Sequence, residues 1–166
     1  MPIKEQEIML KKAIAAIVII SLSTTSHGNF NIHQTDSFVE SEINCLGEAI
    51  YREARGESIT GMSSVGLVVM NRVKSGKFPK TVCGVTHQRT RGMCQFSYVC
   101  NKSLPPIRES EKFKSFYLAK MIYRHQIKDI THGSTFFDMG KMSTNKKMHI
   151  AKSIKIGLHQ FYKDKS

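Results

Sequence analysis

Ten consecutive residues without a charge, Ala13 to Leu22, follow an N-terminal end that carries three lysines. A membrane-spanning helix needs about 20 apolar residues, so this run is too short to cross a bilayer. Small and polar residues follow it, and this order is typical of a secretory signal. We therefore predict that residues 1–28 are a signal peptide or signal anchor, the alternative being an amphipathic or buried helix. The rest of the chain is then exported, to the periplasm, the cell wall or the medium.

Export of the chain determines how its four cysteines are interpreted. All four lie beyond the signal, and an oxidising compartment favours two disulfides over free thiols. Sequence allows three connectivities, of which we favour Cys94–Cys100, closing a short loop, with Cys45–Cys83 joining two distant segments. Four free, buried thiols are the alternative. The spacing matches no standard zinc pattern, and no histidine pair has the HExxH spacing, so we predict no metal and no cofactor.

The chain of 166 residues is strongly basic, with 25 lysines and arginines against 13 acidic residues. Beyond residue 28 the net charge is still +11, from 22 basic and 11 acidic residues. Such a balance suggests an anionic polymer as partner: nucleic acid, an acidic membrane surface or a wall polymer. A solvated basic surface is the alternative. The length fits about one domain, and the 40% hydrophobic content excludes a disordered or fibrous chain.

Apolar periodicity predicts a mainly helical α+β domain with a small, irregular sheet. Residues 29–41 are polar and are expected to form a linker, with the folded domain at 42–166. Glycines at 56 and 76 mark helix ends, and Thr60 is a plausible N-cap. The expected elements are helices at 43–55, 61–74 and 109–127 and extended segments at 134–137 and 154–162.

One carboxyl group in the first helix stands out. Leu46, Ala49, Ile50 and Glu53 fall at i, i+3, i+4 and i+7, which is one helix face. Burial of a carboxylate raises its pKa, and a carboxyl that stays protonated near neutral pH suits a general acid. The alternative is that Glu53 reaches solvent at the helix end or pairs with an arginine such as Arg55.

Other polar and aromatic side chains have simpler interpretations. Glu48 has Arg52 at i+4, which predicts a surface ion pair, and Glu57 lies near the start of the next helix. Asn71 and Arg72 are expected to make local hydrogen bonds at a helix end. Three aromatic residues in the third helix are expected in the core, with sugar platforms as the alternative: Phe113, Phe116 and Tyr117.

Several separate blocks resemble the SleB-type cell wall hydrolase family. They are EAIYREARGE, NRVKSGKFPKTVCGV, CQFSYVCN and, near the end, IGLHQFYK, in that order. Together they cover roughly residues 44–162. This resemblance implies a lysozyme-like fold that cleaves the glycan strands of peptidoglycan, with Glu53 as the catalytic glutamate. It also implies that Gln95, Phe96 and Ser97 contact the substrate, and Tyr98, which follows them, is our sugar-stacking candidate.

The chain departs from the family at one point. Many bacterial relatives have Thr-His-Tyr-His where this chain has Thr135-Phe136-Phe137-Asp138, so any contact made by those histidines does not transfer. Asp138 could be a second carboxylate, but it lies in this departing segment. A single acid suffices for a lytic transglycosylase, in which the substrate supplies the nucleophile; a muramidase that uses water is the alternative.

A second class of function is a non-catalytic, basic protein of the envelope or wall. No RNA-binding or helix-turn-helix signature is present, and export argues against nucleic acid as the partner. The expected partner is therefore the glycan strand of peptidoglycan. We expect a monomer that meets the membrane only through its N-terminal segment.

Overall fold

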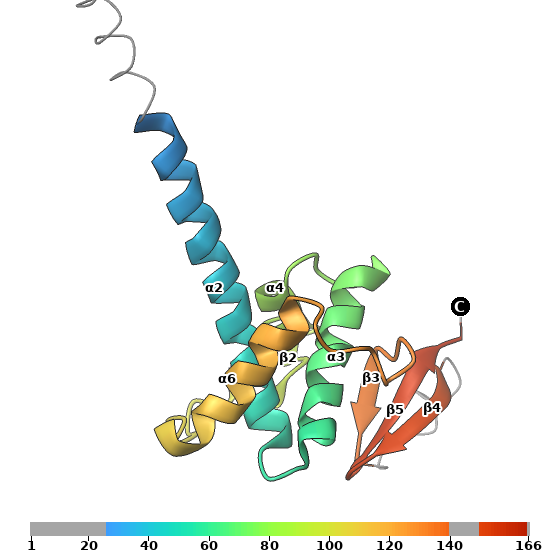
Figure 1. The fold of residues 1–166 in the computed structure, drawn as a ribbon. Helices are drawn as coiled ribbons and strands as arrows, with labels where there is room; N and C mark the ends of the chain where they lie inside the picture. The colour runs from blue at the N-terminus through green and yellow to red at the C-terminus, as the bar shows by residue number, and fades with distance from the viewer. Residues whose placement is uncertain (1–25, 140–149, 166) are drawn as a thin grey trace, which may run out of the picture. The chain divides into compact units, whose positions relative to one another are not determined.

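The structure, a computed structural model, describes residues 26–139 and 150–165 (Figure 1). The predicted signal segment, residues 1–28, lies almost entirely outside this part of the chain, so it stays a prediction. Within the described ranges, no helix combines the length and the apolar character that a membrane crossing requires.

The chain divides into two compact units, residues 1–39 and 40–166. Helix α2, Ser26–Ala54, has residues in both. The first helix therefore begins at Ser26 and not near residue 43, and residues 29–41, for which we predicted a linker, are helical. Their polar composition suggested a linker, but they contain neither glycine nor proline, so nothing in them stops a helix that packing supports further along.

The core of the second unit forms where three helices meet: the packed part of α2, α3 (Ile59–Ser75) and α6 (Glu109–Tyr123). Gly66 of α3 makes this possible, because a Cβ at this position would approach Ile122 and Ile50 to 2.7 and 2.8 Å. Helix α3 is capped by Ser58, whose side chain accepts a hydrogen bond from Gly61, and not by Thr60. It ends as predicted, at Gly76 with a φ of +71°.

Helix α6 ends at Tyr123, four residues before the predicted end. Leu118 and Ile122 are buried, as the apolar pattern of this helix predicts, but not all of its expected core residues are. Two of its aromatic residues, Phe113 and Tyr117, are 77% and 52% exposed, so the prediction that they lie in the core is wrong. Small side chains let α6 approach its neighbours, and its buried residues are Ser115, Leu118, Ala119 and Ile122.

Short elements connect α3 to α6 along the chain, and two disulfides hold these elements in place. Helix α4 (Val82–Thr86) is followed by the β1–β2 hairpin, Arg89–Thr90 and Met93–Cys94, and by helix α5 (Ser97–Cys100). The structure contains both predicted disulfides. Cys45–Cys83 ties α2 to α4 across 38 residues of sequence, which is worth about 4 kcal/mol in the chain-entropy account. Cys94–Cys100 ties β2 to α5.

The remaining elements form an antiparallel sheet in the order β3-β5-β4. Its strands are β3 (Phe136–Asp138), β4 (Ile150–Ile156) and β5 (His159–Asp164), and α3 lies between this sheet and α6 (Figure 1). The single extended segment predicted at 154–162 is a hairpin instead, because Gly157, with a φ of +56°, turns the chain. The prediction of a mixed α+β fold with mainly helical structure is confirmed.

Candidate active site

Glu53 lies at the end of the buried stripe of α2. Leu46, Ala49 and Ile50 are 0% exposed, as the helical spacing predicted, and Glu53 itself is half-buried. Burial raises the pKa of the Glu53 carboxyl above its ordinary value of 4.5, and the positive charge of Arg72 acts in the opposite direction. Burial therefore shifts Glu53 toward its protonated form, and the Arg72 cation lies within electrostatic range.

The Glu53 carboxyl accepts no hydrogen bond from any side chain or backbone group within the described ranges. Arg55, the ion-pair partner considered from the sequence, is turned elsewhere. Its guanidinium donates to the Tyr51 hydroxyl at 3.3 Å and lies over the Tyr51 ring. Neither a hydrogen bond nor an ion pair with Arg55 therefore fixes the Glu53 carboxylate in this part of the chain.

Arg72 is the site residue whose importance the sequence analysis missed. It is 5% exposed, and its Nε donates to the Thr135 carbonyl at 2.7 Å. Its guanidinium lies 5.2–5.8 Å from the centroids of three rings, and burial lowers its pKa to about 10, against the opposing effect of Glu53. Its buried Nη1 has no hydrogen-bond partner in the part of the chain described. The three rings belong to Phe78, Phe96 and Phe136.

A sequence signal for Arg72 existed. Val65, Val68, Val69 and Arg72 repeat on α3 the i, i+3, i+4, i+7 spacing that leads to Glu53 on α2. Each helix thus carries one charged residue at the end of an apolar stripe, and folding brings those two charges within electrostatic range.

The four predicted substrate contacts fall into two groups. Gln95 and Ser97 are exposed, and Gln95 helps to line a cavity of about 490 Å³ beside the β1–β2 hairpin. Phe96 is 2% exposed, so its ring is not available to a sugar and the prediction of direct contact is wrong. It lies instead beneath the site, 5.3 Å from the Arg72 guanidinium and 6.0 Å from the Tyr98 ring.

Tyr98 is half-buried and belongs to the electrostatic environment of Glu53. Burial raises the pKa of the Tyr98 hydroxyl, and the carboxylates of Glu48 and Glu53 raise it further. Its ring contacts that of Phe96, with ring centroids 6.0 Å apart. The folded chain brings Glu53, Arg72 and Tyr98 into one region, with Phe96 as its floor.

The other acidic candidates are engaged elsewhere. Glu48 pairs with Arg52 at 3.4 Å, as predicted. Asp138 accepts a hydrogen bond from the Tyr162 hydroxyl at 3.1 Å. The Glu57 side chain is 7% exposed and has an oxygen 2.7 Å from Nδ1 of His159.

Two polar side chains near α3 and α4 have local roles. The Asn71 amide donates to Asp129, Thr131 and the Ser134 carbonyl, all at 3.1 Å, and so holds the loop before β3. His87 closes α4, with Nδ1 3.0 Å from the Cys83 carbonyl. Within residues 34–139 and 150–165, no three His, Cys, Asp or Glu side chains gather closely enough to hold a metal ion.

A sequence model described as Cell Wall Hydrolase matches residues 56–162. This match begins three residues after Glu53, so it does not bear on the role of that residue. Two similar curated proteins are spore cortex-lytic enzymes. That of Oceanobacillus iheyensis is 36% identical over 58 residues, 35% of this chain and 21% of the relative. That of Bacillus subtilis is 42% identical over 48 residues, 29% of this chain and 16% of the relative.

The chain thus spans only about a fifth of the length of these relatives. Solved structures match over more of the chain. The catalytic domain of a germination-specific lytic transglycosylase, SleB, from Bacillus anthracis is 30% identical with a TM-score of 0.55, covering 74% of this chain and 93% of that one. The SleB catalytic domain of Bacillus cereus is 27% identical with a TM-score of 0.54, covering 75% and 91%. These likenesses confirm the lysozyme-like α+β fold that the resemblance implied.

Proposed function

The chain belongs to the cell wall hydrolase family, and from this premise we propose that its second unit cleaves the glycan strands of peptidoglycan. The bond is the one between N-acetylmuramic acid and N-acetylglucosamine. The reaction is a lytic transglycosylation with Glu53 first as acid and then as base. The similarity to a solved lytic transglycosylase domain supports the reaction class.

One observation carries the proposal: Glu53 is half-buried, accepts no hydrogen bond from the described residues, and has a pKa raised by burial. A general acid must hold its proton until the leaving oxygen takes it. Burial without a hydrogen-bond donor gives a carboxyl that property. Arg72 then stabilises the carboxylate that remains after the proton has left.

The steps balance with one carboxyl group. Glu53 gives its proton to the glycosidic oxygen, and the bond from that oxygen to C1 of the muramic residue breaks. The 6-hydroxyl of the same muramic residue forms a bond to C1, and its proton passes to the Glu53 carboxylate. The products are a 1,6-anhydro end and a free 4-hydroxyl, and Glu53 is protonated again.

The engagement of the other carboxylates supports a single-carboxyl mechanism. A glycosidase that uses water needs a second carboxylate as base or nucleophile. Asp138 accepts a hydrogen bond from the Tyr162 hydroxyl. The Glu57 side chain contacts His159 and is largely buried. Neither group is placed as an open partner for Glu53, which favours a nucleophile that belongs to the substrate.

The basic surface and the exposed loop fit the same substrate. Gln95 and Ser97 are exposed, and the half-buried Tyr98 feels the charge of Glu53, so we assign the sugar contacts to these three residues. The net charge of +11 beyond residue 28 attracts an anionic wall. Action on the wall also requires that the second unit works outside the cytoplasm, in agreement with the predicted export signal.

A zymogram under non-reducing conditions tests the proposal. Wild-type protein is expected to clear a gel that contains peptidoglycan, and Glu53→Gln is expected to leave it opaque. Asp36→Asn is the control, since it removes an exposed carboxylate from the same helix, 17 positions before Glu53. Equal clearing by wild type and Glu53→Gln contradicts the assignment of Glu53 as the catalytic acid. No clearing by either protein contradicts the proposal as a whole and favours a non-catalytic wall-binding protein.

Mass analysis of the released fragments tests the reaction type. Lytic transglycosylation predicts 1,6-anhydro ends, which are lighter by one water molecule than the ends produced by hydrolysis. Reducing ends alone would replace our assignment with a muramidase that uses water.

A further inference from the structure

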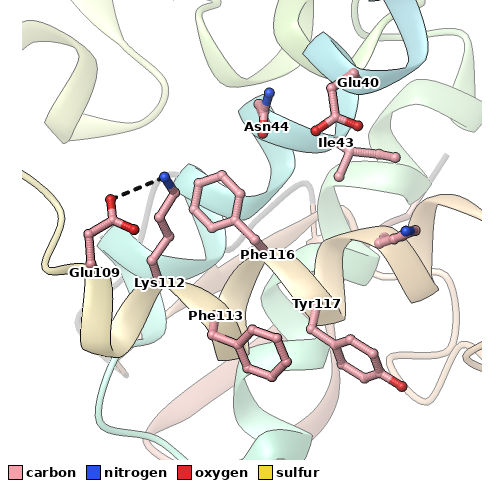
Figure 2. Close-up of a pocket in the computed structure, with 9 residues that line it drawn as sticks. Glu40, Ile43, Asn44, Glu109, Lys112, Phe113, Phe116 and Tyr117 are labelled. Carbon is pink, nitrogen blue, oxygen red and sulfur yellow. Dashed lines mark hydrogen bonds and ion pairs between the residues drawn. The ribbon is translucent and has the colours of Figure 1, made fainter. Parts of the chain in front are cut away.

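Two exposed aromatic side chains stack on each other on α6. The rings of Phe113 and Tyr117 have centroids 6.0 Å apart and planes inclined by 19°, and they project from the same side of the helix (Figure 2). They are 77% and 52% exposed. Exposing two large rings side by side loses the free energy of burial that a core position would provide. We call this pair the aromatic platform.

The aromatic platform borders a groove of about 530 Å³ between α6 and the packed part of α2. Phe116 points from α6 toward Asn44 of α2, and Lys112 lies 5.4 Å from the centroid of the Phe116 ring (Figure 2). The lining therefore combines aromatic faces with an amide and charged groups. Amphipathic sugar rings, which have C–H faces and a rim of hydroxyls, are recognised by this mixture of aromatic surface, donors and acceptors.

Basic residues continue the line of the platform. Phe113, Tyr117 and Lys120 fall at i, i+4 and i+7 on one face of α6, and Arg124 is the C-cap residue that follows the helix, so the face changes from aromatic to basic toward its C-terminal end. Lys120 and Arg124 are both exposed. A strand of alternating sugars that bears carboxylates matches this order, with rings on the aromatic part and acids on the basic part.

Asn44, which lines the groove, lies on the opposite side of α2 from Glu53. The two residues are nine positions apart, which at 100° per residue leaves half a turn between them, and the axial separation is about 14 Å. A ligand in the groove therefore leaves the Glu53 site open. From the stacked rings, the mixed groove and the basic continuation, we infer that this face of α6 and α2 is a second peptidoglycan-binding site that holds a glycan strand away from the catalytic centre. The inference rests on the proposed function for the identity of the ligand.

The test measures retention without turnover. Purified insoluble peptidoglycan is mixed with the full chain carrying Glu53→Gln, and the bound fraction is followed by sedimentation over a range of wall concentrations. Adding Phe113→Ala and Tyr117→Ala is expected to weaken retention by about tenfold, the scale of losing stacked aromatic contacts. Both side chains are exposed, so the thermal unfolding midpoint is expected to stay unchanged.

Leu158→Ala in the same background is the matched control, because it removes a 63% exposed apolar side chain from a different element. It is expected to leave retention unchanged. Lys120→Gln is expected to weaken retention less than the double substitution does and to reduce its sensitivity to salt.

Two results overturn the inference. One is equal retention of the platform variant and its parent. The other is a parent that sediments as a dimer in ultracentrifugation while the platform variant is monomeric with unchanged retention, which makes the face an interface between copies. Failure of the proposed function is seen separately, as clearing of peptidoglycan by Glu53→Gln, because retention is measured without any catalytic step.

Discussion

Two glutamates occupy the two ends of one buried stripe on α2, in opposite chemical situations. Glu42 and Glu53 are 11 residues apart, which places them on the same helix face with Leu46, Ala49 and Ile50 between them. Glu42 is 3% exposed, and its carboxylate accepts hydrogen bonds from the backbone N–H groups of Val82, at 2.5 Å, and Cys83, at 3.1 Å.

Glu53 is less buried and yet accepts no hydrogen bond from the described residues. Glu42 therefore closes the start of α4 next to the Cys45–Cys83 disulfide, where a charged carboxylate suits the N-terminal end of a helix. The comparison teaches that burial does not by itself mark a functional carboxyl group. The distinguishing property is burial without donors, which leaves Glu53 free to take and release a proton.

Exchange of each glutamate for glutamine should separate the two roles, and the largest effect is expected at Glu53. Glu53→Gln should lower the rate of wall degradation by about a thousandfold, within the range that general acid–base groups contribute. Its midpoint of thermal unfolding should stay close to that of the wild type, because no hydrogen bond in the described structure is lost. Turbidity loss of a wall suspension and a melting curve give both quantities.

At the other end of the stripe, Glu42→Ala should destabilise the fold and spare the chemistry. Two backbone N–H groups of α4 would lose their acceptor, at a cost of about 1–3 kcal/mol in the free energy of unfolding. Urea unfolding under non-reducing conditions measures this cost. Activity per folded molecule should stay near the wild-type value at a temperature well below the transition. A stable but inactive Glu42→Ala protein would contradict the assignment of a structural role to Glu42.

The charge of Arg72 offers a finer test of Glu53. Because Arg72 lowers the pKa of Glu53, its replacement by methionine should raise that pKa further. Activity depends on the protonated acid and is lost as pH rises through its pKa, so the alkaline limb of the kcat/KM profile should move to higher pH. Arg72→Lys keeps the charge and should leave the limb in place. Equal movement in both variants would mean that packing against the three rings, and not charge, is what Arg72 supplies.

The sequence predicted the parts of the site that depend on local periodicity. Leu46, Ala49 and Ile50 are buried as expected, because a helical repeat fixes which side chains share a face whatever the partner is. The even cysteine count and the expected compartment predicted two disulfides, and of the three possible connectivities the structure contains the one that we favoured. The catalytic role of Glu53 stays a prediction, although its surroundings suit it.

What the sequence could not provide depends on tertiary packing. Arg72 becomes a site residue only because α3 packs beside α2, and Phe96 becomes its floor for the same reason. The exposure of Phe113 and Tyr117 shows that the buried face of α6 is turned away from these two aromatic residues. A Cβ at Gly47 would approach the Phe116 ring to 2.7 Å, so this close approach helps to set which face of α6 turns inward.

The smallest effect is expected at Asp129, in the loop before β3. As at Glu42, hydrogen-bond donors surround its carboxylate. Burial alone would raise the pKa of Asp129, but hydrogen bonds from Thr131, Gly133 and Asn71 outweigh it and hold the pKa below the ordinary value of 3.8. A group whose pKa is lower in the folded state stabilises the fold above its unfolded pKa. That stability is lost as pH falls through the folded pKa.

Asp129→Asn should therefore cost about 1 kcal/mol of unfolding free energy at neutral pH, the usual size for a weakened hydrogen-bond set. Below about pH 4 the difference from wild type should shrink, because the wild-type carboxylate is then being protonated and loses the same advantage. Urea unfolding at several pH values measures both. A difference that stays constant down to pH 2 would show that Asp129 stabilises the loop through shape and not through charge. In that case only Glu42 would support the conclusion that surrounding hydrogen-bond donors stabilise the charged form of a buried carboxyl group.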